Sequence, residues 1–275
     1  MLSLVKSGRR SVAASKRRKM ARHDVAVAYL HPNTVGHNFH QSLLQLALYD
    51  QHNHNRLGQW LTMRSGSGGI VEARNQIHEQ VADLPSSIQW LLWIDADMGF
   101  APDSLDRLLA AADPVDRPIV GGLCFAWKEI QPDGLNGFHC VARPTIFDWV
   151  EHDDGHKRFT GVVEFPTDEV MSCAATGTAF LLVHRSVVER VAESRDTHGR
   201  WFDRIKGSDG SLLGEDISFC VRATAAGFPI HVHTGVVTNH LKELWVTDAV
   251  YDQERLIHSV MARTADPVES PTDGS

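Results

Sequence analysis

The chain has 275 residues, which suits one large domain or two small ones, and 43% of them are hydrophobic, enough for a substantial core. No apolar run approaches the roughly 18 residues of a membrane-spanning helix, and the basic N-terminus shows no secretory-signal pattern. The scattered cysteines, without a C-x-x-C spacing, argue against a structural zinc site and a disulfide framework and favour reduced thiols in a cytosolic protein. They are Cys124, Cys140, Cys173 and Cys220.

The net charge of −7 is unevenly distributed along the chain. Residues 1–22 hold eight lysines and arginines and no acid, which leaves 19 basic against 34 acidic residues in the remainder. A basic arm can contact nucleic acid or an anionic membrane, but the acidic remainder offers no basic groove. We therefore expect a basic, disordered leader at 1–22 and no nucleic-acid partner. Whether Met1 or Met20 is the start stays open.

Hydrophobic periodicity in the first part of the chain predicts alternating strands and helices. Residues 25–30 form a short apolar run that ends at a turn, and residues 36–49 carry apolar side chains at helical spacing. A second strand is expected at 57–63 and a second helix at 72–81, behind the glycine-rich loop 64–69. Such a loop before a helix favours anions, but neither the dinucleotide-binding nor the P-loop glycine pattern is present.

Arg74 and Asn75 lie in the first turns of that second helix, where they could reach a nucleotide. A solvated helix face would place the same residue types there, so both interpretations remain open.

The most informative stretch is residues 90–98, where five large apolar residues run into Asp95 and Asp97. A short apolar run bounded by turn residues predicts a buried strand, and side chains at i and i+2 of a strand point the same way. Both acids are therefore expected at the carboxyl end of a central strand, where open α/β sheets bind ligands. Mg²⁺ or Mn²⁺ would suit this pair, although two solvated acids would give the same short pattern.

The middle of the chain predicts a helix at 101–112 and a buried strand at 119–125. Residues 127–161 are rich in turns and mixed in polarity, which indicates a long excursion with short strands that shapes a pocket. Small residues at 173–179 precede a strand at 180–183 and leave space for a ligand.

The last part predicts a helix at 186–193, and a loop at 207–210 that could act as a mobile lid. Glu215 and Asp216 then begin a helix that Gly227 closes. Acids at a helix start are favoured by the helix dipole, so capping alone could explain this pair.

Short strands at 230–232 and 236–237 lead to His240. The tail at 263–275 is rich in Pro, Ser, Thr and Asp and is expected to be disordered.

Four segments in this order resemble the GT-A glycosyltransferases, close to family 2 and its bacterial and phage relatives. They are Ala73-Arg74-Asn75 on a helix, Asp95-Ala96-Asp97 after an apolar strand, Thr176-Gly177-Thr178 before a strand, and Gly214-Glu215-Asp216 leading to His240. The resemblance implies a GT-A (Rossmann-like) α/β fold with a mixed, mainly parallel central sheet flanked by helices. It implies one domain at 23–262, with a nucleotide-binding half at about 23–126 and an acceptor half at about 127–262.

The same resemblance implies transfer of a sugar from a nucleotide-diphosphate sugar, a UDP- or GDP-sugar, to an acceptor hydroxyl, with Mn²⁺ or Mg²⁺ on the diphosphate. It implies that Asp97 binds the metal most directly, that Asp95 holds the metal's water or the ribose, and that His240 completes the metal site. His233 is a weaker candidate, since alternation places it and His231 on one strand face.

By resemblance, Asp216 is the first choice and Glu215 the second for the base that takes the acceptor proton in an inverting enzyme. A retaining enzyme would not use that base in this way, and the motifs do not decide between the two outcomes. The resemblance also implies that Thr176, Gly177 and Thr178 contact the donor sugar or the acceptor. Arg74 and Asn75 would contact the nucleotide or a phosphate, and Tyr29 and His31 would lie by the nucleobase.

The chain also departs from the family. Many family members have an acidic residue for the nucleobase in the region of the second strand, but residues 57–63 hold none. The chain also has neither a Q-x-x-R-W pattern nor transmembrane helices, both of which mark processive polysaccharide synthases. We therefore expect a cytoplasmic enzyme, in the host cytoplasm if phage-encoded, that adds one sugar to a glycan, protein or small-molecule acceptor. The alternatives are a non-catalytic nucleotide- or carbohydrate-binding protein and a sugar-nucleotide pyrophosphorylase, whose glycine-rich signature is missing from 31–38.

Overall fold

The computed structural model describes residues 23–66, 68–130, 139–194, 200–207 and 210–242, and a few positions between 248 and 255. The predicted leader and the tail at 263–275 lie outside the described residues, as do the two central residues of the predicted lid. No helix in the part of the chain that is described is long and apolar enough to cross a membrane.

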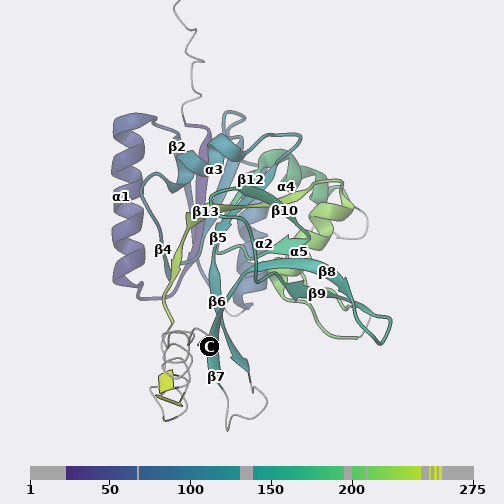
Figure 1. Ribbon diagram of the computed structural model, residues 1–275. Helices are drawn as coiled ribbons and strands as arrows, with labels where there is room; N and C mark the ends of the chain where they lie inside the picture. Colours follow the sequence, from purple (N-terminus) through teal and green to yellow (C-terminus); the bar gives the residue numbers. More distant parts are fainter. Residues whose placement is uncertain are drawn as a thin grey trace, which may run out of the picture.

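A seven-stranded sheet forms the centre of the molecule (Figure 1). In spatial order its strands are β10 (Val170–Cys173), β13 (Ile230–Val237), β5 (Ile119–Leu123), β12 (Phe180–His184), β3 (Trp90–Ile94), β1 (Val25–His31) and β2 (Leu57–Arg64). β1, β2, β3, β5 and β13 run parallel to one another, whereas β12 and β10 run antiparallel. The predicted fold class, an α/β fold with a mixed, mainly parallel central sheet flanked by helices, is confirmed.

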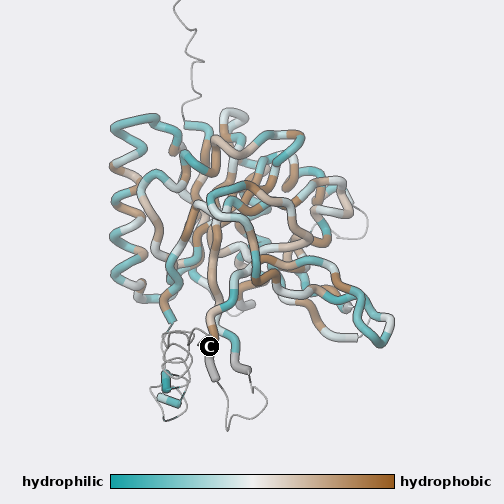
Figure 2. Tube along the Cα trace, in the orientation of Figure 1, coloured by the Kyte–Doolittle hydropathy of each residue, from teal (hydrophilic) through white to brown (hydrophobic). Residues whose placement is uncertain are grey.

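Helices cover both faces of this sheet. One face packs against α2 (Gly69–Val81), α4 (Arg185–Ala192) and α5 (Glu215–Ala225), and the other against α1 (His37–Asn53) and α3 (Ser104–Ala111). The inner strands are apolar on both faces because both are covered, and the hydropathy colouring shows this concentration along them (Figure 2). Burial of these side chains is the main stabilising contribution to the fold.

The predicted excursion at 127–161 does carry short strands. They form two small sheets, β6 (Phe125–Ile130) with β7 (His139–Pro144), and β11 (Ala175–Thr176) with β8 (Ile146–Glu151) and β9 (Lys157–Gly161). A further pair, β4 (Met98–Gly99) and β14 (Asn239–His240), joins the segment after the central strand to the segment after β13.

Several boundaries differ from those expected. The helix predicted at 36–49 continues to Asn53, and the second helix begins at Gly69, whose φ of +72° suits glycine. The strands predicted at 230–232 and 236–237 are one strand, β13, with a register irregularity between His233 and Val237. Pairing with β5 carries the chain across the glycine that interrupts the apolar pattern.

Leu182 and Leu48 offer a matched test of this layering. Leu182 lies in β12 between β3 and β5 and is fully buried, whereas the side chain of Leu48 on α1 is 55% exposed. We expect Leu182→Ala to lower the free energy of unfolding by about 2–5 kcal/mol and Leu48→Ala by no more than about 0.5 kcal/mol, measured by urea denaturation. Equal losses would contradict the central position of β12.

Candidate functional site

The D-x-D segment, Asp95-Ala96-Asp97, follows β3 directly but is a turn rather than an extension of the strand. The Met98 backbone N–H donates to the Asp95 carbonyl oxygen at 3.1 Å, and the Asp95 N–H donates to the Ala179 carbonyl oxygen at 2.8 Å. The prediction that Asp95 and Asp97 continue the strand and point the same way by alternation is therefore wrong, because the two residues lie in a turn. Both side chains nevertheless reach the carboxyl edge of the sheet, as the buried strand predicted.

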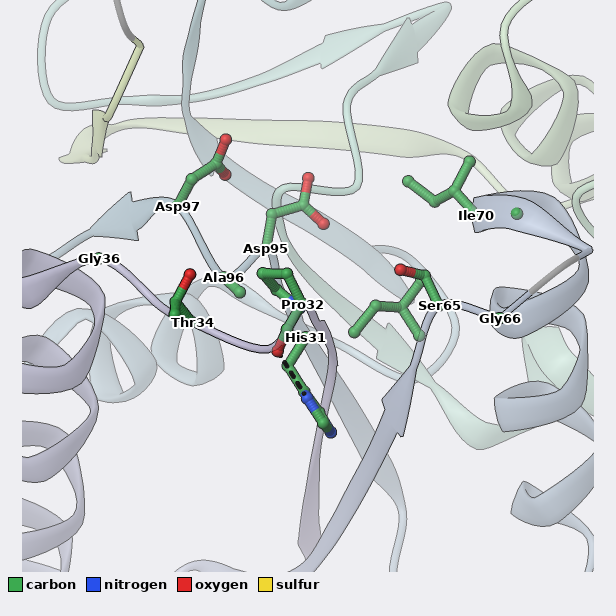
Figure 3. Close-up of a pocket in the computed structure, with 12 residues that line it drawn as sticks. His31, Pro32, Thr34, Gly36, Ser65, Gly66, Ile70, Asp95, Ala96 and Asp97 are labelled. Atoms are coloured by element: carbon green, nitrogen blue, oxygen red, sulfur yellow. Dashed lines mark hydrogen bonds between the residues drawn. The ribbon is translucent and has the colours of Figure 1, made fainter.

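A pocket of about 430 Å³ opens at this edge (Figure 3). It is bounded by the end of β1, the loop after it, the start of α2 and the D-x-D turn; its walls include His31, Thr34, Ser65, Ile70, Asp95 and Asp97. Its size lies in the range of small-molecule sites. His31 thus lines this pocket, while Tyr29 packs edge-on against Phe39, with ring centroids 5.3 Å apart, and does not.

Two basic side chains from the far end of the described chain contact Asp97. Its Oδ2 accepts from His240 Nε2 at 3.0 Å and from Lys242 Nζ at 2.8 Å. The β4–β14 pair brings them there, since His240 lies opposite Met98, and the Leu241 N–H donates to the Asp97 carbonyl oxygen. His240 Nδ1 faces the Phe125 carbonyl oxygen at 2.6 Å, which fixes the ring.

These contacts shift the pKa values of the pair in opposite directions. Burial would raise the pKa of Asp97, but the hydrogen bonds from His240 and Lys242 outweigh it and lower the pKa to about 2. The hydrogen bond to Asp97 raises the pKa of His240 against the opposing effect of burial. An ionised carboxylate therefore faces the pocket at neutral pH.

Asp95 belongs to a different network, centred on Arg74. The guanidinium of Arg74, whose side chain is 1% exposed, donates to Asp95 Oδ1 at 3.0 Å, to Glu215 Oε1 at 3.4 Å and to Asp216 Oδ1. We call these four residues the Arg74 cluster. Burial would lower the pKa of Arg74, but the three carboxylates raise it, so the guanidinium stays charged. Burial raises the pKa of Asp95 despite the neighbouring Arg74 charge.

The small-residue segment before β12 closes the other side of Asp216. The Thr178 hydroxyl donates to Asp216 Oδ1 at 2.5 Å, and the Thr176 hydroxyl donates to the Thr145 carbonyl oxygen at 2.8 Å. A Cβ placed on Gly177 would lie 3.5 Å from Thr145 and 3.8 Å from Asp216 Oδ2, so Gly177 leaves a gap between them. The predicted segment 176–178 thus borders the carboxylate, although Thr176 and Thr178 are themselves buried.

Asn75 is fully buried and turned away from the pocket. Its Oδ1 accepts from the backbone N–H groups of Trp201 and Phe202 at 2.9 and 3.0 Å, and its Nδ2 donates to Asp203 Oδ1 at 3.0 Å. These bonds use its side chain to hold segment 201–203 against α2, and this arrangement does not favour the predicted nucleotide contact. Arg74 is likewise enclosed by its own cluster rather than open to a phosphate.

A layer of aromatic rings packs against the Arg74 guanidinium. Its guanidinium carbon lies 5.9 Å from the Trp93 ring centroid and 5.6 Å from that of Phe202, within range of cation–π attraction. His78, fully buried in the same layer, accepts from Trp93 Nε1 at 3.1 Å. Burial, together with the Arg74 charge, lowers the pKa of His78 to about 3, so His78 is neutral at physiological pH.

The residues near the pocket fit a divalent cation in part. Asp97 and His240 supply a carboxylate and an imidazole, and the bond of His240 Nδ1 to a backbone carbonyl is the arrangement that metal-ligating histidines adopt. No group of three or more His, Cys, Asp or Glu side chains suited to a metal exists within the described ranges. His233 lies on β13 beside Arg107 and Asp168, and the described contacts do not connect it with Asp97.

Sequence reasoning missed Lys242 and Thr145. Lys242 could have been found, because it lies two residues after His240 and an extended chain turns i and i+2 to one side. No local signal marks Thr145; only the pairing of β8 with β11 brings it to Gly177.

No protein-family model and no curated protein matches this chain. Among solved structures it is similar to A197 from STIV (11% identity, 80% of this chain, 86% of that chain, TM-score 0.48). It is also similar to GalNAc-T7 crystallised with UDP, GalNAc and Mn²⁺ (10% identity, 87% of this chain, TM-score 0.49), spanning 48% of that chain. A third is a glycosyltransferase involved in the glycosylation of the major capsid of PBCV-1 (15% identity, 60% of this chain, 61% of that chain, TM-score 0.30).

The neutral, buried His78 predicts an acid-sensitive fold. Its folded pKa of about 3 lies below the unfolded value of about 6.5, so the unfolded state binds more protons between these pH values. Stability is therefore lost as pH falls from about 6.5 towards 3, by up to about 1.4 kcal/mol per pH unit from this group. Urea unfolding at pH 7, 6 and 5 should show a shallower loss for His78→Gln, whose amide can still accept from Trp93.

His40, exposed on α1, provides the matched control. His40→Gln should leave the pH dependence of unfolding unchanged. If His78→Gln loses stability with falling pH as steeply as the wild type does, His78 is not the group that causes this loss.

Proposed function

We propose that the chain is a GT-A-type glycosyltransferase that moves a sugar from a nucleotide-diphosphate sugar to an acceptor hydroxyl. One observation carries the proposal: a pocket at the carboxyl edge of the parallel strands is lined by Asp97, which His240 contacts, and by Asp95, which is joined through Arg74 to Asp216. A cation site for a diphosphate thus adjoins a carboxylate that can accept a proton. The four matching sequence segments support the same family.

The donor would occupy the pocket of 430 Å³. His31, which lines the pocket at the end of β1, would contact the nucleobase, and the ribose and diphosphate would extend towards the D-x-D turn. Gly69 and Ile70 begin α2 and line the same pocket, so the N-terminal end of that helix faces the donor. Free backbone N–H groups and the helix dipole favour an anion there.

Mn²⁺ or Mg²⁺, held by Asp97 and His240, would neutralise the charge that develops on the departing diphosphate. Lys242 and His240 both contact Oδ2 of Asp97, so a cation at that oxygen would displace these contacts, and His240 Nε2 would have to be unprotonated to hold it. The ammonium group of Lys242 would then be available to the diphosphate. Asp95, with one oxygen on Arg74, contributes to the wall of the pocket rather than to a compact three-ligand set.

Asp216 is the proposed base of an inverting reaction. Its Oδ1 accepts from both Thr178 and Arg74, which fixes the carboxylate. Oδ2 faces the gap beside Gly177 and has no hydrogen-bond partner among the described residues, so it is free to take the acceptor's proton. Glu215 is engaged by Arg74 and by Arg204, whose Nη2 lies 3.5 Å from Oε2, and is the second choice.

Nucleotide binding tests the donor site directly. We expect calorimetry to show binding of UDP or GDP that requires Mn²⁺, and Asp97→Ala to abolish the metal dependence, because the carboxylate is the anionic ligand at that position. Asp153→Ala, which removes an exposed acid in the β8–β9 turn, is the control and should bind as the wild type does. Metal-dependent binding that survives in Asp97→Ala would move the cation site elsewhere.

The rate of the transfer reaction tests whether Asp216 is the base. In an inverting enzyme, Asp216→Asn should keep nucleotide affinity and lower the rate of donor cleavage by roughly 10²–10⁴-fold, measured as release of the nucleoside diphosphate. Glu215→Gln should lose less, since Glu215 does not face the Gly177 gap. Wild-type turnover in Asp216→Asn would contradict the assignment. Nucleotide binding without any donor cleavage by the wild type would favour the non-catalytic alternative.

A further inference from the structure

A second hollow, of about 210 Å³, lies between the β6–β7 pair and the β8–β9 pair. In Figure 1 the β6–β7 pair extends below the main sheet and the β8–β9 pair extends to its lower right. The walls of the hollow include Lys128, Arg143, Pro144, Phe147, Val162 and Val163. None of these residues belongs to the donor pocket or to the Arg74 cluster.

Two cations stand on one side of this hollow. Ala126 lies opposite Arg143 and Lys128 opposite Val141 in the antiparallel β6–β7 ladder, so Lys128 and Arg143 project from the same face as diagonal neighbours. Neither forms an ion pair or a side-chain hydrogen bond with any residue in the described ranges. The remainder of the chain after residue 22 is strongly acidic, whereas these two adjacent cations have no ionic partner among the described residues, so they focus positive potential at the hollow.

The rest of the wall is apolar. Phe147, Val162 and Pro144 leave the hollow few polar groups besides the two cations. A ligand that fits this wall has a compact body with a non-polar face and one anionic group. A sugar ring bearing a phosphate or a carboxylate has this combination.

The hollow adjoins the proposed base through Thr145. Thr145 follows Arg143 and Pro144 directly in the chain, and its side chain and Asp216 Oδ2 both border the gap that Gly177 leaves. Residues 143–145 therefore run from the wall of the hollow to the gap that Asp216 Oδ2 borders. Asp95, another member of the Arg74 cluster, lines the donor pocket.

We propose that this second hollow is the acceptor subsite and that the acceptor is a saccharide carrying a phosphate or carboxylate group, bound by Lys128 and Arg143. The two cations hold the anionic group and thereby direct a hydroxyl of the same molecule towards Asp216. Its role as an acceptor site rests on the proposed transfer reaction. Its capacity to bind an anionic saccharide does not, so the two can fail separately.

The test uses the full chain and three probes with one scaffold: glucose 6-phosphate, glucuronic acid and glucose. Titrations followed by NMR, with saturating UDP and diamagnetic Mg²⁺ present to block the donor pocket, should shift the backbone amides of residues 143, 145–147 and 161–163. Both anionic probes should bind at least tenfold more tightly than glucose, and their ranking shows whether phosphate or carboxylate is preferred. Without UDP and Mg²⁺ the same shifts should appear, which separates this site from the donor site.

The double variant Lys128→Gln/Arg143→Gln should reduce the affinity for both anionic probes at least tenfold and leave that for glucose unchanged. UDP binding should remain at the wild-type level, which also verifies folding. Lys157→Gln removes an exposed cation at the far end of β9 and should have no effect. Equal binding of all three probes, or wild-type affinity in the double variant, would overturn the proposal. Lys128 and Arg143 would then be surface cations without a ligand. Absence of UDP binding with intact anion binding would refute the proposed function instead.

Discussion

The arrangement of the site depends on one buried guanidinium. Arg74, from α2, contacts carboxylates from the turn after β3 and from the start of α5, elements that are far apart in the sequence. Without this cation, Asp95, Glu215 and Asp216 would repel one another at a partly buried edge of the sheet. Burying a charge is costly unless partners and packing compensate, and here three carboxylates and the rings of Trp93 and Phe202 do so. The position of the proposed base, Asp216, therefore depends on the packing of α2 against the sheet, because α2 carries Arg74.

The two acids of the D-x-D turn are separated by this constraint. Asp95 is held inward by Arg74, while Asp97 contacts His240 and Lys242, which the β4–β14 pair brings to it. One acid thus belongs to the buried cluster, and the other presents an ionised carboxylate at the pocket. The proposed cation site depends on the short pairing of β4 with β14.

The Arg74 cluster connects the two proposed regions, since Asp95 lines the donor pocket and Asp216 borders the gap beside Gly177. Gly177 matters because the absence of its side chain keeps Asp216 Oδ2 open towards Thr145 and the second hollow. Thr178 and Arg74 meanwhile fix the other oxygen. One oxygen of Asp216 is therefore held in place, and the other, without a hydrogen-bond partner among the described residues, borders the Gly177 gap on the proposed acceptor side.

The sequence by itself determined the buried central strand, the alternation of strands and helices, the helix that starts at Glu215 and the sheet edge to which the D-x-D acids belong. Each of these follows from periodicity over a few residues, which local side-chain pattern encodes directly. The domain division at about residue 126 and the individual catalytic and ligand-binding roles remain predictions.

The tertiary structure alone decided which partners those acids have. The turn at 95–97 replaced strand alternation because the Asp95 N–H pairs with Ala179 of the neighbouring segment. Asn75 and Arg74, adjacent in one helix, proved to face different surroundings, segment 201–203 and the carboxylate cluster. These outcomes depend on contacts between residues more than 80 positions apart, and no pattern within a short stretch of sequence encodes such contacts.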